Sequence, residues 1–129
     1  MHNKVLLLVS SLTSDAVQEK EQRRARSLLE AKGTVFEEID GADPAMTEKR
    51  NQLFGLGHTA RYPQFFIERE DGKVTYVGGW EEVEAMNECS DMPVEILRAN
   101  PQIQTFDMVF AHVQRRKRRT VSAVPVASS

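Results

Sequence analysis

Cysteine is almost missing from this chain of 129 residues, which contains Cys89 alone. A single cysteine cannot form a disulfide within the chain, a Cys-x-x-C redox pair or a multi-cysteine metal site. The sequence also lacks a run of about 20 apolar residues, the length that a helix needs to cross a bilayer. The apolar run 5–9 near the start is too short for a signal peptide. We therefore expect a soluble, intracellular protein with no metal ligands.

Positive charge is scarce outside one short segment. The run 115–119 holds five of the 17 basic residues and none of the 19 acidic ones. The other 12 basic residues face all 19 acidic residues, which gives the rest of the chain a net charge of −7. Because binding of nucleic acid depends on basic side chains that neutralise phosphates, we do not expect the folded part to bind DNA or RNA.

The first half of the sequence predicts two parallel strands joined by a helix. Residues 5–9 are continuously apolar, which is typical of a strand buried on both faces near the centre of a sheet. Ser14 or Asp15 can cap a helix over residues 15–32, and Gln18 can reach back to the cap if Asp15 takes this role. Residues 35–39 form the next strand, so a right-handed crossover between parallel strands is expected.

Two helices of this half have an apolar side. One helical face of residues 15–32 is expected to carry Val17, Glu21, Ala25, Leu28, Leu29 and Lys32. The second helix is expected to begin at Asp43-Pro44, because an N-cap aspartate and a first-turn proline favour a helix start. Gly55 and Gly57 are expected to end it.

The second half predicts a hairpin followed by a helix. Residues 64–68 and 73–77 read as strands, and Asp71-Gly72 between them is a hairpin signal. The apolar residues of the following segment recur at helical spacing: Trp80, Val83 and Met86. The order βαβα then ββα predicts an α/β fold, with a four-stranded mixed sheet flanked by helices.

Two groups of residues give the sequence a family resemblance. Tyr62-Pro63 before one hairpin strand and Gly78-Gly79-Trp80 after the other resemble glutaredoxins and the wider thioredoxin-like fold. Residues 28–32 (Leu-Leu-Glu-Ala-Lys) followed by 35–40 (Val-Phe-Glu-Glu-Ile-Asp), after a serine-rich first loop, resemble the SH3-domain-binding glutamic acid-rich-like protein family. The resemblance covers roughly residues 4–88. It implies a glutaredoxin-type, thioredoxin-like βαβαββα fold and an adaptor or binding role without redox thiols.

The chain departs from that family in two places. Members of the family that bind SH3 domains carry a proline-rich segment before the third strand, where this chain has a single proline, Pro63. An SH3 groove reads a PxxP ligand, so we do not expect SH3 binding. The glutamate-rich tail of the family is also absent, and the tail here is basic.

The resemblance implies that the first loop is a degenerate active site. A glutaredoxin keeps a reactive thiolate at the N-terminus of its first helix. The corresponding positions here are Ser10, Ser11, Leu12, Thr13 and Ser14. A serine nucleophile would need a neighbouring base, and the chain offers only His2, His58 and His112. We expect no catalytic residue; the hydroxyl groups are expected to cap the first helix, and Cys89 is expected to be a buried or half-buried apolar residue.

The same resemblance implies a binding edge at the start of the hairpin. Pro63 is expected to be cis, and the main chain of Tyr62 is expected to face the cysteinyl part of a glutathione-like ligand. Gly79, Trp80 and Glu81 would then lie near the glutamyl end of that ligand. Each residue also has a purely structural interpretation: strand geometry for the proline, a turn for Gly78-Gly79, and a hydrophobic anchor for Trp80.

The C-terminal part is expected to form a helical extension over residues 91–114 beyond a domain at 1–90. Apolar residues at helical spacing give this extension one apolar face: Phe106, Val109, Phe110 and Val113. That face either docks on the domain or binds a partner, which includes a second copy in a homodimer. Residues 115–129 are expected to be a basic, disordered tail, in which 115–119 read as a nuclear import signal, an anchor to an acidic surface or a solvated run.

Together these features favour a redox-inactive, glutaredoxin-like protein-interaction module of the cytoplasm, with the nucleus as a second setting. The alternative is a small-ligand module that still binds glutathione or a related thiol at Tyr62, Pro63, Gly79, Trp80 and Glu81. The identity of the protein partner does not follow from the sequence.

Overall fold

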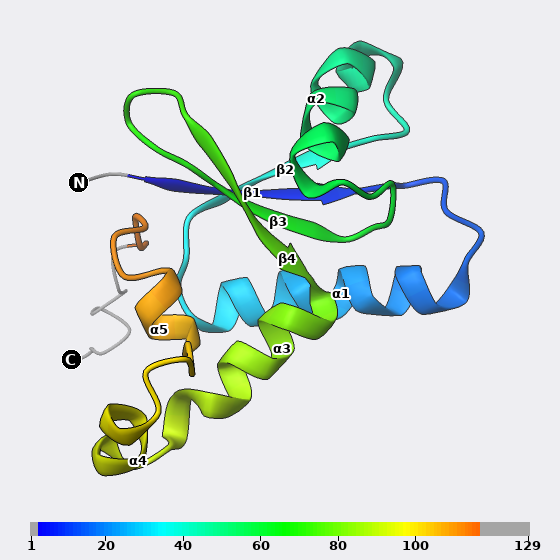
Figure 1. Cartoon of the computed structure of the whole chain (residues 1–129). Helices are drawn as coiled ribbons and strands as arrows, with labels where there is room; N and C mark the ends of the chain where they lie inside the picture. Colours follow the sequence, from blue (N-terminus) through cyan, green and yellow to red (C-terminus); the bar gives the residue numbers. More distant parts are fainter. Residues whose placement is uncertain (1–2, 117–129) are drawn as a thin grey trace, which may run out of the picture.

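A computed structural model describes residues 3–116 of the chain, and it has a mixed α/β architecture (Figure 1). One four-stranded sheet runs through the middle, with α2 above it in this view and α1, α3 and α5 below. In chain order the elements are β1 (Lys4–Val9), α1 (Ala16–Ala31), β2 (Phe36–Asp40), the 3-10 helix η1 (Pro44–Met46), α2 (Thr47–Gly57), β3 (Gln64–Glu68), β4 (Val74–Gly79), α3 (Trp80–Glu88), the 3-10 helix η2 (Cys89–Asp91), α4 (Val94–Ala99) and α5 (Phe106–Val109).

The strand order is β2-β1-β3-β4. β1 pairs with β2 in parallel and with β3 antiparallel, and β3 pairs with β4 antiparallel. The sequence prediction of a parallel unit followed by a hairpin in a mixed four-stranded sheet is therefore confirmed. Residues 5–9 are buried, as expected for a strand with neighbours on both sides and helices on both faces.

Helix α1 begins at the cap that the sequence offers. The Asp15 carboxylate accepts hydrogen bonds from the N–H groups of Val17 and Gln18, which otherwise have no partner within the helix. The expected helical face wrongly included Val17 and omitted Gln22. Val17 is 55% exposed and Gln22 is buried, because α1 turns Gln22 toward the end of β1.

The second helical segment also departs from expectation. It starts as η1 with Asp43 as its cap and continues as α2 through Gly55 to Gly57. The prediction that Gly55 helps to end the helix was wrong, since glycine weakens a helix without stopping it. The stop comes at His58, which adopts a left-handed conformation with φ of 56°.

Strand β4 extends further than predicted. Gly78 and Gly79 belong to the strand, opposite Phe65 and Gln64, so the interpretation of this pair as a turn was wrong. A bulge at Val77 shifts the register by one residue. Gly78 has φ of 158°, and a Cβ there would lie 2.7 Å from Cβ of Glu82. The glycine thus lets the first turn of α3 fold tightly against the strand that precedes it.

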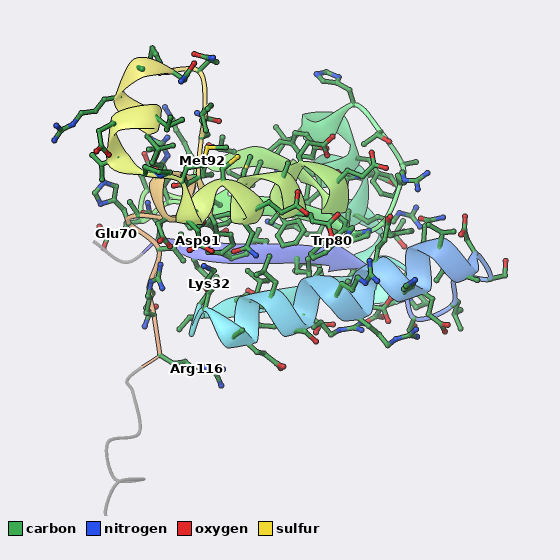
Figure 2. All side chains as sticks on the ribbon, turned by 90° about the horizontal axis from the view of Figure 1, so that it is seen from below. Lys32, Glu70, Trp80, Asp91, Met92 and Arg116 are labelled. Carbon is green, nitrogen blue, oxygen red and sulfur yellow. The ribbon has the colours of Figure 1, made fainter. Side chains whose placement is uncertain are left out.

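Two hydrophobic clusters lie on opposite faces of the sheet. The α2 side consists of Leu6, Leu8, Ile39, Leu53 and Phe66. The other cluster lies between the sheet and helices α1 and α3, which Figure 2 shows from below. It consists of Val5, Leu7, Val9, Ala25, Leu29, Phe65, Trp80, Val83, Phe106, Phe110 and Val113. The C-terminal extension therefore contributes to the main core.

The extension docks on the sheet as one of the two alternatives proposed. Phe106 and Phe110 are fully buried and their rings stack with centroids 4.2 Å apart. The helix expected from the spacing of Phe106 to Val113 is shorter than predicted, because α5 is a single turn and the chain then becomes extended. Gln114 N–H donates to Asn3 O at 2.8 Å, and Gln114 O accepts from Val35 N–H at 2.9 Å. This extended segment thus ties the start of β1 to the start of β2.

Two residues of the predicted basic tail, Arg115 and Arg116, also belong to this extended segment. Arg116 N–H donates to Gly33 O, and an Arg115 guanidinium N–H donates to Lys32 O at the end of α1, near the labelled Lys32 and Arg116 of Figure 2. Residues 117–129 of the predicted tail lie outside the described residues. Within residues 3–116, no helix has both the length and the apolar character needed to cross a membrane.

Candidate functional site

The serine-rich loop follows β1 and is held by side chains from α1 and β2. The Gln22 amide bonds to both backbone groups of Ser10: its Oε1 accepts from Ser10 N–H at 2.7 Å and its Nε2 donates to Ser10 O at 3.2 Å. Both contacts are buried, so a single side chain satisfies two backbone groups that water does not reach.

A carboxylate fixes the next residue of the loop. Asp40 Oδ1, at the end of β2, accepts from Ser11 N–H at 3.0 Å and from Ala42 N–H at 2.9 Å. Burial acts to raise the pKa of Asp40, but the hydrogen bonds from Ser11 and Ala42 outweigh it and lower that pKa. The loop is therefore anchored to two elements of the fold.

The loop hydroxyls stabilise turns rather than the helix. Ser10 Oγ accepts from Leu12 N–H at 3.3 Å and Thr13 Oγ1 accepts from Asp15 N–H at 3.2 Å. The expectation that these hydroxyls cap α1 was wrong, since the Asp15 carboxylate takes that role. Within residues 3–116 no hydrogen bond joins His58 to a serine of this loop. Cys89 lies at the C-terminal end of α3, away from the loop, and is half-buried.

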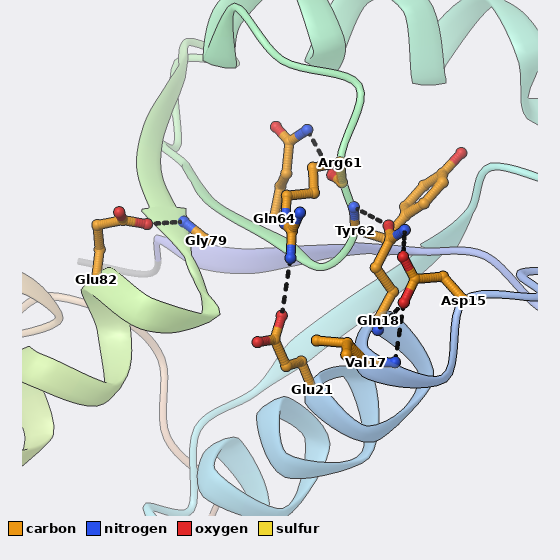
Figure 3. Close-up of polar contacts among 9 residues, drawn as sticks. All are labelled: Asp15, Val17, Gln18, Glu21, Arg61, Tyr62, Gln64, Gly79 and Glu82. Atoms are coloured by element: carbon orange, nitrogen blue, oxygen red, sulfur yellow. Dashed lines mark hydrogen bonds and ion pairs between the residues drawn. The ribbon is translucent and has the colours of Figure 1, made fainter.

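The peptide bond between Tyr62 and Pro63, at the predicted binding edge, is cis as expected. The backbone N–H of Tyr62 already has a hydrogen-bond partner. Tyr62 N–H donates to Oε1 of Gln18 at 2.8 Å, and Nε2 of Gln18 donates to the Asp15 carboxylate at 3.1 Å (Figure 3). The cap of α1 therefore orients the side chain that occupies the backbone group expected to face a ligand.

The second backbone donor of the predicted site is occupied in the same way. Gly79 N–H donates to Oε1 of Glu82 at 2.8 Å (Figure 3). Glu82 lies three residues into α3, so this contact is the acidic half of a capping box; glycine has no side chain to supply the other half. The backbone N–H groups of Tyr62 and Gly79, two residues predicted to contact a ligand, are thus both bonded internally.

A cavity of about 200 Å³ lies between these groups. All five residues predicted for a ligand line it: Tyr62, Pro63, Gly79, Trp80 and Glu81. None of Ser10–Ser14 does. The other residues of its wall are Glu21, Thr59, Arg61, Gln64, Tyr76 and Glu82. The structure therefore brings together the two halves of the predicted binding edge and leaves the serine loop outside the cavity.

The wall of this cavity, called here the acidic cavity, carries more negative than positive charge. Glu21, Glu81 and Glu82 face one arginine, Arg61, whose guanidinium lies 4.0 Å from Glu21. Burial raises the pKa of Tyr76, and the negative charge of Glu82 raises it further. A ligand with a positive group is therefore favoured over an anionic one.

One buried acceptor in the wall has no partner. Gln64 is 1% exposed, and its Nε2 donates to the backbone oxygens of Thr59 and Arg61 at 2.9 and 2.8 Å. Among residues 3–116, nothing donates to its Oε1. This oxygen is itself buried and packs against α2, because a Cβ on Gly57 would lie 2.5 Å from it.

Sequence reasoning missed the residues that close the site. Gln18 was recognised only as a partner of Asp15, and Gln22 was not recognised at all. No local pattern identifies them, since the contact between Gln18 and Tyr62 joins positions 44 residues apart. The only available signal is a pair of glutamines one turn apart, Gln18 and Gln22, on a helix that follows a buried strand.

Among residues 3–116, no group of three or more His, Cys, Asp and Glu residues is placed to hold a metal ion. A scan of protein-family models finds no match to the chain, and a search of curated proteins finds no significantly similar relative.

Proposed function

We propose that this chain is a redox-inactive, glutaredoxin-related protein of thioredoxin-like fold that acts as a protein-interaction module. The proposal includes the resemblance to the SH3-domain-binding glutamic acid-rich-like family, without its SH3 ligand. The proposed setting is the cytoplasm, or the nucleus if the basic run 115–119 acts as an import signal.

One observation carries the proposal: the backbone donors that would hold a thiol ligand are bonded to the protein's own side chains. A glutathione-like ligand would have to displace Gln18 from Tyr62 and Glu82 from Gly79. It would also bring a net negative charge to a wall with three glutamates and one arginine. Both effects oppose its binding.

The first loop supports the same conclusion from the chemical side. Its backbone is fixed by Gln22 and Asp40, and its polar side chains carry hydroxyl groups, which are far weaker acids than a thiol. Thiol–disulfide exchange has no nucleophile there. Leu12 within this loop is 78% exposed, and Val17, in the first turn of α1, is 55% exposed. These apolar side chains suit contact with another protein better than they suit catalysis.

The test is a titration of the full chain with reduced glutathione, followed by amide shifts, together with a turnover assay on a glutathione mixed disulfide. We expect no saturable shift at Tyr62 or Gly79 and no turnover. Turnover that survives Cys89→Ser would overturn the proposal.

The acidic cavity favours one alternative, a small-ligand module for glutathione or a related thiol. This alternative predicts saturable shifts confined to Tyr62, Gly79 and Trp80 in the unaltered chain. Gln18→Ala sharpens the distinction, because it frees the Tyr62 N–H without changing the cavity's charge. If glutathione binds only after Gln18→Ala, the internal hydrogen bond is what excludes it; Val17→Ala, in the same turn, serves as the matched control.

A further inference from the structure

The two edge strands of the sheet are protected to different degrees. β2 carries Glu37 and Glu38, which form ion pairs of 2.8 Å with Lys4 and Arg26. Charged residues on an edge strand discourage pairing with another chain. β4, at the opposite edge, has the sequence Val-Thr-Tyr-Val-Gly-Gly and contains no charged residue and no proline. The β4 edge therefore lacks the protection that the β2 edge has.

The outer backbone of β4 has groups available for pairing. Arg69 N–H donates to Lys73 O at 2.8 Å, and Thr75 lies opposite Ile67. Because hydrogen-bonded pairs alternate along an antiparallel ladder, Thr75 bonds to β3 while the N–H and C=O groups of Val74 and Tyr76 point outward. In the part of the chain that the structure describes, no strand pairs with β4 on this side.

A larger cavity of about 740 Å³ lies beside the same strand. It opens between the hairpin, α3 and the C-terminal extension, and its apolar wall consists of Ile67, Val77, Met86, Val109 and Val113. Thr75, Tyr76 and Val77 are three consecutive residues of its lining. Tyr76 also lines the acidic cavity. The larger cavity is also lined by Arg69, Glu70, Asp71 and His112. The outer strand thus runs between this cavity, with its apolar wall, and the acidic cavity.

This arrangement suits an extended peptide. Successive side chains of a strand point to opposite faces of the sheet, so neighbouring residues of an added strand would reach the two cavities. Main-chain bonds to an edge supply affinity in this mode of recognition, and pockets for alternate side chains supply specificity. The three glutamates of the acidic cavity favour a positively charged side chain there.

We propose that the β4 edge binds an extended segment of a partner protein as an added strand. An apolar side chain of the segment enters the large cavity, and a lysine or arginine side chain enters the acidic cavity. The proposal rests on the proposed interaction function and assigns it a surface and a ligand chemistry. It leaves Leu12 and Val17, at the other end of α1 from the large cavity, outside the contact.

The probe is a displayed library of short random peptides, selected against the full chain. We expect enriched peptides to alternate apolar and other residues and to carry a lysine or arginine at a fixed position. Binding of a synthetic copy of an enriched peptide should slow hydrogen exchange of the Val74 and Tyr76 amides. Absence of enrichment, or of this protection, overturns the proposal.

Two substitutions test the contact separately. Thr75→Lys places a charge on the edge and should weaken binding of the selected peptide by about tenfold or more. Thr75→Val, which keeps the strand apolar, is its control. Glu81→Gln should weaken the lysine-bearing peptide and leave its lysine-to-alanine version unchanged; Glu88→Gln, on the same helix but outside both cavities, should change neither.

Other results would assign the surface differently. If a selected peptide binds but shifts only the amide signals of residues around Leu12 and Val17, the β4 site is overturned and the interaction function stands. Protection of Val74 and Tyr76 in the free protein, together with a dimer in solution, means that a second copy occupies the edge, which also overturns the proposed occupant. The glutathione and turnover assays decide the proposed function independently of these outcomes.

Discussion

The two ends of the sheet are closed by different means. At the end where β1 and β2 finish, single polar side chains accept hydrogen bonds from backbone N–H groups, which we call polar closures. The three pairs are Gln22 with Ser10, Gln18 with Tyr62 and Glu82 with Gly79. At the other end a whole chain segment, from Thr105 to Arg116, covers the sheet with buried apolar side chains. One substitution can therefore open a polar closure, whereas the apolar closure is part of the core. We therefore expect substitutions at the first end to change function, and substitutions at the second end to lower the free energy of unfolding.

The strongest test of this comparison is at the apolar end. Phe110→Ala removes a fully buried ring that packs in the main cluster and stacks on Phe106. Truncations of this kind cost about 3–5 kcal/mol of the free energy of unfolding, which urea denaturation measures. Met108→Ala is the control, because Met108 lies in the same turn and is 51% exposed. Its effect should stay within about 0.5 kcal/mol. Equal effects of the two changes would mean that the extension is not part of the core.

This result also decides how partners should be mapped. A chain that ends before Thr105 would lose Phe106 and Phe110 from the core, so loss of a partner on truncation would report unfolding. The expected homodimer through this helix stays a prediction, although its apolar side chains are already covered by the sheet. Full-length surface variants are the suitable reagents.

The second test compares two glutamines of α1. Gln22→Leu should cost about 1–3 kcal/mol, because it leaves both backbone groups of Ser10 buried without partners. Gln18→Leu removes the same kind of amide from a partly exposed position, where water can replace it. It should cost about 1 kcal/mol or less. Chemical denaturation of both variants measures the difference, and the reverse order would show that burial does not control the polar closures.

Signals that act within a few residues were readable in the sequence. Asp15 caps α1 and Gly33 follows it with φ of 67°, as a helix end requires. Asp71-Gly72 lies in the hairpin connection, where Gly72 also has positive φ. The alternation of strands and helices then determined the mixed sheet, because a helix between two strands favours a parallel pair and a short turn requires an antiparallel one.

Features that depend on distant partners were not readable. The spacing of Phe106, Val109, Phe110 and Val113 fits a helix, yet the backbone of residues 113–116 bonds to strand starts far away in the sequence. Tertiary contacts overrode the helical pattern there. The residues of the binding edge were predicted through a resemblance. Its closure by Gln18 could not be predicted, since it depends on where α1 lies relative to Tyr62.

The smallest expected effect is the pH dependence of the polar end. The pKa of Asp40 is lowered in the folded protein, because the hydrogen bonds from Ser11 and Ala42 outweigh the effect of burial. A carboxyl group whose folded pKa lies below its unfolded value stabilises the protein above the unfolded value, about 3.9, and this contribution is lost as pH falls through the folded pKa. Urea denaturation across this acid range should show a shallower loss of stability for Asp40→Asn than for the unaltered chain.

Carbon shifts of the Asp40 carboxyl group give its titration directly, and the midpoint should lie below that of an unperturbed aspartate. The same titration reports on the serine loop, since Ser11 N–H donates to this carboxylate. If Asp40 titrates at the ordinary value, Ser11 does not hold the charged form. The loop would then be fixed by Gln22 alone, and one side chain fewer would hold the backbone at this end of the sheet.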